Sequence, residues 1–108
     1  MEKFIMDLII FSGEARSYAM EAIQLAKLGQ VDEARNLIEK SKETLGNAHA
    51  TQTRLIQNEA AGNKCEVSLL LVHAQDHLMT SIVVKDLAEE IIDLHERLDK
   101  VECKKCID

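Results

Sequence analysis

The chain has 108 residues and a net charge of −6, and its composition is 46% hydrophobic but only 3% aromatic, with no proline. A β-sandwich or barrel needs aromatic and β-branched strands between glycine and proline turns, and a doubly wound sheet needs many short strands. This composition suits neither of these folds. It predicts instead a single all-α domain over residues 1–108, built from a few long helices. An acidic chain without a basic cluster is also poorly suited to nucleic acid, because that affinity depends on neutralising phosphates.

Glycines mark two breaks that divide the chain into three expected helices, at about 2–28, 33–61 and 66–100, followed by a tail at 101–108. At the first break we expect Gly29 to adopt the left-handed conformation that ends a helix, and Asp32 to cap the helix that follows. The second break contains Gly62. Because both connections are short, consecutive helices should run antiparallel and form a three-helix bundle.

The first expected helix begins in an apolar run that contains Asp7 and has no small-residue cleavage site. We therefore interpret this run as a helix and not as a signal peptide, and we expect a cytoplasmic protein. The core seam of this helix alternates steps of four and three residues and contains all three aromatic residues of the chain. Its members are Phe4, Leu8, Phe11, Ala15, Tyr18, Ala22 and Leu25.

The second expected helix carries a weaker seam and a histidine in its middle. The seam consists of Ala34, Ile38, Ser41, Leu45, Ala48, Gln52 and Leu55. We expect His49 to be buried and hydrogen-bonded, with a position close to the candidate site of the third helix as the alternative. His95, in the third helix, is expected at the surface or in a seam.

The third expected helix is apolar on every side between residues 67 and 84, VSLLLVHAQDHLMTSIVV, and this stretch contains no Lys, Arg or Glu. Its length approaches that of a membrane span, but seven polar residues argue against insertion into a membrane. A helix that is apolar all round is normally buried all round. A lone three-helix bundle leaves one face of each helix in water, so we expect the chain to associate with other copies of itself.

Three ionisable residues of this helix, His73, Asp76 and His77, stand at positions i, i+3 and i+4 and therefore share one face. A buried carboxylate normally survives only when it is paired, protonated or bound to a metal. One interpretation is purely structural, with a satisfied histidine and a protonated Asp76. A second is a helical metal-binding bundle that uses His73, Asp76 and His77, although no Glu-x-x-His motif completes such a site on another helix. A third is a nucleophilic histidine that accepts and donates a group near neutral pH.

The run from Leu69 to Thr80, with HAQDHLM at 73–79, resembles the active-site signature of enzyme IIA of the lactose/cellobiose (lactose/N,N′-diacetylchitobiose) class of the bacterial sugar phosphotransferase system. Four further segments match the family's pattern. They are GEARS at 13–17, AH at 48–49 with QT at 52–53, EVSLL at 66–70 and VKDLA at 84–88. The resemblance covers about residues 5–98.

The resemblance implies a homotrimer of three-helix protomers, forming a nine-helix bundle, that works as a phosphoryl carrier. The first histidine of the signature, here His73, would accept a phosphoryl group on its tele nitrogen from phosphorylated HPr and pass it to a cysteine of the cognate IIB component. Gln75 and His77 match signature positions that support this histidine. The family's membrane component binds the sugar, so the signature is shared by lactose, cellobiose and chitobiose branches.

By the same resemblance, Asp76 would lie on the three-fold axis, where three copies meet around a magnesium ion. Three carboxylates that meet on an axis raise one another's pKa. Either a hard divalent cation such as Mg²⁺ or protonation relieves that repulsion, and the residues are compatible with both.

The cysteines have no place in this scheme. Three of them, Cys65, Cys103 and Cys106, do not make a disulfide framework. Cys103 and Cys106 form a C-x-x-C in the tail, which departs from the family, and two cysteines are only half of a zinc site. We expect a frayed tail without a role there, and an inert loop residue at Cys65.

Overall fold

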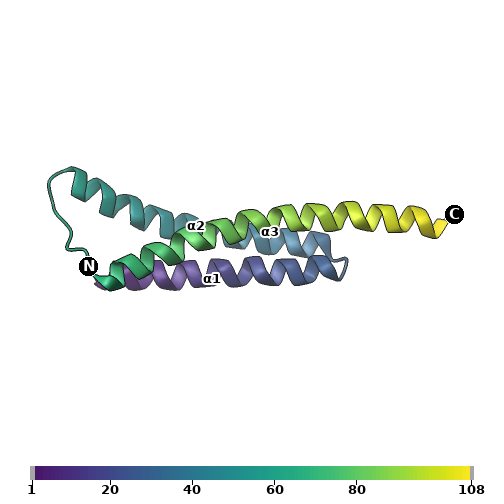
Figure 1. Cartoon of the computed structure of the whole chain (residues 1–108), viewed down its shortest axis with the longest axis horizontal. Coiled ribbons are helices and arrows are strands. Elements are labelled where there is room, and N and C mark those ends of the chain that lie inside the picture. The colour runs from purple at the N-terminus through teal and green to yellow at the C-terminus, as the bar shows by residue number, and fades with distance from the viewer. Residues whose placement is uncertain (1, 108) are drawn as a thin grey trace.

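A computed structural model describes residues 2–107 of the chain, and the side chains of residues 2–103. Over this range the chain forms three helices and no strand: α1 (Glu2–Lys27), α2 (Val31–Ala60) and α3 (Leu69–Ile107). Figure 1 shows α1 and α2 running antiparallel, with α3 returning alongside them and projecting beyond the turn that joins them. The molecule is 67 Å long and about 20 Å across. The prediction of an all-α, antiparallel three-helix bundle is confirmed.

The turn between α1 and α2 depends on Gly29, whose φ of +80° is the predicted left-handed conformation. The predicted cap by Asp32 is wrong. The N-cap of α2 is Gln30, without a side-chain capping hydrogen bond, and Asp32 lies in the first helical turn. A carboxylate in that turn is still favourable, because it faces the positive end of the helix dipole.

The bounds of α3 differ from the predicted 66–100 at both ends. The backbone N–H of Leu71 donates a hydrogen bond of 3.1 Å to Ser68 Oγ, so Ser68 caps the helix and fixes its start at Leu69. The connection before it, 61–68, is consequently longer than predicted, and Gly62 in it has a φ of +97°.

The separate tail predicted at 101–108 is wrong for residues 101–107, which continue α3. No glycine or proline follows residue 100, so nothing in the sequence stops the helix there. The Cys103 side chain is exposed on this extension. The side chain of Cys106, and with it the predicted C-x-x-C unit, lies outside the described residues.

The bundle core consists of two clusters placed one after the other along its axis. The first contains Ile5, Leu8, Ala15, Leu45, Ala48, Ala74 and Leu78. The second contains Ala19, Ala22, Ala26, Ala34, Ile38, Ala88 and Ile92. Buried serines lie between the clusters on two of the helices, Ser41 on α2 and Ser81 on α3. Ser41 Oγ donates a hydrogen bond of 2.7 Å to the carbonyl of Ala15 on α1.

The second-helix seam is confirmed: its first five members are buried, and Gln52 and Leu55 are half-buried. The first-helix seam is wrong in part. The buried positions of α1 are Ile5, Leu8, Ser12, Ala15, Ala19, Ala22 and Ala26. Phe4 is 37% exposed, and the other two aromatics are only half-buried. Small side chains occupy the centre because they let the helices approach closely, so the larger rings lie beside the helix contacts.

Within residues 2–107, no helix combines the length and the hydropathy that crossing a membrane would require.

Candidate functional site

The orientation of α3 in the bundle decides where each predicted site residue lies. Ala74 and Leu78 are fully buried and define the inner face of the helix. Successive residues of an α-helix are rotated by about 100°, so His73 falls on one flank of this face, Gln75 on the other, and Asp76 on the opposite, outer side. The predicted residues therefore divide into three separate surroundings.

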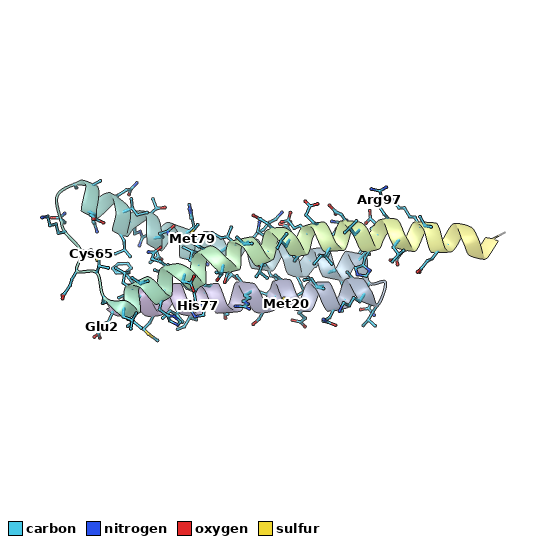
Figure 2. The ribbon with its side chains drawn as sticks, in the orientation of Figure 1. Glu2, Met20, Cys65, His77, Met79 and Arg97 are labelled. Carbon is cyan, nitrogen blue, oxygen red and sulfur yellow. The ribbon has the colours of Figure 1, made fainter. Side chains whose placement is uncertain are left out.

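His73 and His77 form a contacting pair, which we call the histidine pair. Their Nε2 atoms are 3.1 Å apart, and the two rings meet edge to face with centroids 4.4 Å apart. His73 is exposed and His77 is half-buried. His77, labelled in Figure 2, lies in the first half of α3, near the end of the bundle that carries the 61–68 connection. Leu69, Leu70 and His73 line an open hollow there.

A hydrogen bond between two imidazoles requires one ring to donate and the other to accept. If His77 carries its proton on Nε2, it donates to Nε2 of His73, whose own proton then lies on Nδ1. This arrangement holds the His73 ring, and the electron pair on its Nε2 is the one that accepts the hydrogen bond. The spacing of four residues predicted a shared face for His73 and His77, and in the structure their rings are in contact on it.

Gln75 lies away from the histidine pair, against α2. Its Oε1 accepts a hydrogen bond of 2.5 Å from Gln52 Nε2, and both side chains are half-buried. Among the described residues, Gln75 is not hydrogen-bonded to His73, and its side-chain partner in the single chain lies on α2. The sequence places Gln52 in the seam of the second helix and in a segment that matches the family's pattern, but it does not predict the bond to Gln75, because a bond between helices depends on their relative register.

Asp76 is exposed, and within the described part of the chain its carboxylate makes neither a hydrogen bond nor an ion pair. It lies in a row of exposed apolar side chains that follows the outer side of α3, which we call the outer stripe. The stripe consists of Val72, Met79, Val83, Leu87, Leu94, Leu98 and Val101, each 49–62% exposed. Met79 is labelled in Figure 2. The chain by itself therefore does not bury α3 on all sides.

The three-residue metal site is not assembled within one chain. Across the described residues, no group of three or more His, Cys, Asp or Glu side chains is close enough to hold a metal ion. His73 and His77 meet, but Asp76 points to the outer side of the helix. Residues at positions i, i+3 and i+4 thus share one broad side of the helix, but their side chains do not all reach a common point.

The prediction for His49 is wrong, because its side chain is exposed. It lines a shallow groove between α2 and α3, together with Lys42 and Lys85. His95 is half-buried, as a seam position would be. Cys65 lies in the 61–68 connection and is half-buried, with Sγ 3.6 Å from the carbonyl oxygen of Glu66.

Ion pairs hold α2 and α3 together beyond the site. Lys85 Nζ lies 2.6 Å from Asp86 and 3.4 Å from Glu89, and Lys42 Nζ from α2 also lies 3.4 Å from Glu89. The hydrogen bond to Asp86 raises the pKa of Lys85 above its ordinary value of 10.5, so Lys85 stays charged. Of these three pairs only Lys42–Glu89 joins α2 to α3, because Asp86 and Glu89 lie on the same helix as Lys85.

Comparison with known proteins adds a decisive observation. Residues 3–96 match the model of the family described as the lactose/cellobiose-specific IIA subunit of the phosphotransferase system. The chain belongs to this family. It is therefore a phosphotransferase-system enzyme IIA component, and the resemblance predicted from the HAQDHLM signature is confirmed.

Individual relatives agree over almost the whole chain. The lichenan-specific phosphotransferase enzyme IIA component of Bacillus subtilis is 53% identical, over 91% of this chain and 89% of its own length. The crystal structure of the cellobiose-specific enzyme IIA from Bacillus anthracis superposes with a TM-score of 0.90 at 54% identity, covering 92% of this chain and 91% of that one. The solution structure of the Escherichia coli IIA(chitobiose)–HPr complex gives a TM-score of 0.80 at 47% identity, covering 91% and 95%.

Proposed function

We propose that this IIA component carries a phosphoryl group on Nε2 of His73, accepting it from phosphorylated HPr and passing it to a cysteine of the cognate IIB component. The observation that carries the proposal is the histidine pair, in which an exposed imidazole is held through its Nε2 by a second ring 3.1 Å away. The relative from Escherichia coli has been solved in complex with HPr, which supports the same partner for this chain.

The chemistry follows from the proton positions in the pair. With the proton of His73 on Nδ1, the hydrogen bond from His77 breaks and frees the Nε2 electron pair of His73, which attacks the phosphorus of the HPr phosphohistidine. The new P–N bond forms as the P–N bond to HPr breaks. In the second transfer a cysteine thiolate of IIB attacks the same phosphorus, and Nε2 of His73 recovers its electron pair. Such transfers need mainly positioning and charge stabilisation from the protein.

His77 is the supporting residue of this scheme. While His73 is free, the Nε2–H of His77 holds the acceptor ring in place. Once His73 is phosphorylated, the same N–H is placed to donate to a phosphoryl oxygen. Gln75, bonded to Gln52, supports the site more indirectly, by fixing α2 against the helix that carries His73.

We further propose that the working protein is a homotrimer in which copies of α3 cover one another's outer stripe. Seven apolar side chains, each about half exposed, follow one side of α3, and the exposed Glu90 interrupts the row between Leu87 and Leu94. A large exposed apolar surface with polar residues beside it is characteristic of an interaction site. The row extends over most of α3, so a second and a third copy of the same helix provide an occupant of matching length and chemistry.

In such a trimer the three Asp76 carboxylates would meet near the axis, and together they would hold a Mg²⁺ ion. The donor set fits, because carboxylate oxygens are the ligands that this hard cation prefers and Asp76 has no partner among the described residues of its own chain. When bound, the ion would neutralise the three converging charges. His73, on a different side of α3, would remain at the surface for its two protein partners.

Phosphoryl transfer from HPr tests the proposal directly. We expect stoichiometric labelling of the wild-type chain by phosphorylated HPr, loss of labelling in His73→Ala, and full labelling in the matched controls His49→Ala and His95→Ala. Transfer of the label to a IIB component should follow with the wild-type chain. Persistent labelling of His73→Ala would refute the assignment of the acceptor.

A further inference from the structure

The histidine pair has the dimensions of a metal chelate. Zinc–imidazole bonds are about 2.0–2.1 Å long, so two Nε2 atoms 3.1 Å apart can bind one ion with an N–metal–N angle of roughly 100°, close to tetrahedral. In the structure the two rings stand at 85° to each other. Binding of an ion requires the proton between the two Nε2 atoms to leave and one ring to turn, and the exposure of His73 leaves room for that movement.

The two imidazole ligands favour a borderline-soft divalent transition-metal ion. Imidazole suits zinc, copper and nickel, whereas Mg²⁺ prefers oxygen ligands. The pair opens on the hollow that Leu69 and Leu70 line, so a bound ion would keep open positions for water. The chain carries a net charge of −6, which attracts cations in general.

We propose that His73 and His77 chelate a single divalent transition-metal ion through their Nε2 atoms, and that this ion and the phosphoryl group exclude each other. The exclusion rests on the proposed function, because it requires Nε2 of His73 to be the phosphoryl acceptor. One electron pair cannot bind a metal and phosphorus at the same time. By thermodynamic reciprocity, phosphorylation of His73 must then weaken metal binding as much as the metal opposes phosphorylation.

The site differs from the three-residue site that spacing alone indicated and from the axial Asp76 site. It uses two ligands from a single chain, so it does not depend on assembly. A bound ion there would block phosphorylation of His73, which a site that only stores metal would not do. Its selectivity should follow the usual order for nitrogen ligands, with Cu²⁺ above Ni²⁺ and Co²⁺ below both, and with little affinity for Mg²⁺.

A metal titration without any phosphoryl donor tests the site. Ni²⁺ would be titrated against a chromophoric competitor in a background where Cys65, Cys103 and Cys106 are replaced by serine, so that thiols do not contribute. We expect one Ni²⁺ per chain, and an affinity about tenfold or more lower in His77→Ala and in His73→Ala, because either variant loses the second, intramolecular ligand. The controls His49→Ala and His95→Ala should bind as the parent does. Equal affinity in His77→Ala and the parent would overturn the site.

Labelling by purified phosphorylated HPr, with and without saturating Ni²⁺, tests the exclusion. For each variant we take the ratio of the labelling rate with Ni²⁺ to the rate without it. Any effect of the metal on HPr is the same for all variants, so a difference between their ratios comes from the histidine pair. We expect Ni²⁺ to suppress labelling strongly in the parent and much less in His77→Ala. Undiminished labelling of the metal-saturated parent would overturn the exclusion. Absence of labelling even without metal would contradict the proposed function, whereas the titration alone decides the chelate.

Discussion

Replacement of Leu87 by glutamate should dissociate the proposed trimer while leaving the three-helix protomer folded. Leu87 lies in the middle of the outer stripe and is 57% exposed in the single chain. In the trimer we expect this exposed half of the side chain to be covered by a neighbouring copy. A glutamate there would remove the apolar contact and would place three negative charges close to one another.

The magnitude follows from the exposed fraction. Burying a whole leucine side chain contributes roughly 1.5–3 kcal/mol, so burying the remaining 57% contributes roughly 1–1.5 kcal/mol in each copy. Over three copies the loss is about 4 kcal/mol, which corresponds to about a thousandfold change in the assembly equilibrium at roughly 1.4 kcal/mol for each factor of ten. Repulsion between the glutamates adds to this loss.

Sedimentation equilibrium at micromolar concentration provides the measurement, with circular dichroism to verify that the variant keeps its helices. The matched control is Ala50→Glu, which introduces the same charge at an exposed position of α2, away from the outer stripe. We expect trimers for the parent and the control, and smaller species for Leu87→Glu. A trimer of unchanged stability in Leu87→Glu would refute the assignment of the outer stripe as the subunit interface.

Three further predictions concern single side chains. Asp76→Leu should keep the trimer and lose the bound Mg²⁺, because an apolar residue relieves the converging charges; sedimentation with metal analysis would contradict this if the variant were monomeric. Gln52→Ala should lower the free energy of unfolding by about 1 kcal/mol, because Gln75 loses its hydrogen-bond partner in a half-buried position. Denaturant unfolding measures this change, and equal unfolding free energies for variant and parent would contradict it. Because the pKa of Lys85 is raised in the folded state, the contribution of Lys85 to stability is complete below its ordinary pKa of 10.5 and is lost as the pH rises through the higher folded-state pKa. Lys85→Met should therefore flatten the alkaline part of the plot of unfolding free energy against pH. An unchanged plot would contradict the role of the Asp86 contact.

Features that depend on local sequence were predicted well. Gly29 ends α1 because few other residues adopt its left-handed conformation, and the spacing of four residues places His73 and His77 on one side of α3, where their rings meet. The errors at helix ends are also local. Ser68 caps α3 later than the apolar run begins, and the absence of a stop signal lets the helix continue to Ile107.

Features that depend on how helices face one another were not predictable from the sequence alone. The exposure of His49, the bond from Gln52 to Gln75 and the half-exposed position of Phe4 are all set by the register and distance between neighbouring helices. Hydrophobic spacing locates the buried side of a helix only to within about one side chain. The prediction therefore placed the aromatic residues of α1 in the core, whereas the adjacent alanines occupy that position in the structure. In the proposed trimer the surroundings of Asp76 would depend on contacts between chains, which the spacing of residues within one chain does not specify.

The division of the core into two clusters has a consequence for how the protein tolerates change. The cluster around Leu78 packs directly beneath the histidines, whereas the cluster around Ile92 lies several helical turns away, across the level of Ser41 and Ser81. Packing disturbances decay quickly when few side chains bridge two parts of a core. Substitutions in the cluster around Ile92 should therefore change the geometry of the histidine pair less than substitutions at Ala74 or Leu78, which lie within one turn of the two rings on α3.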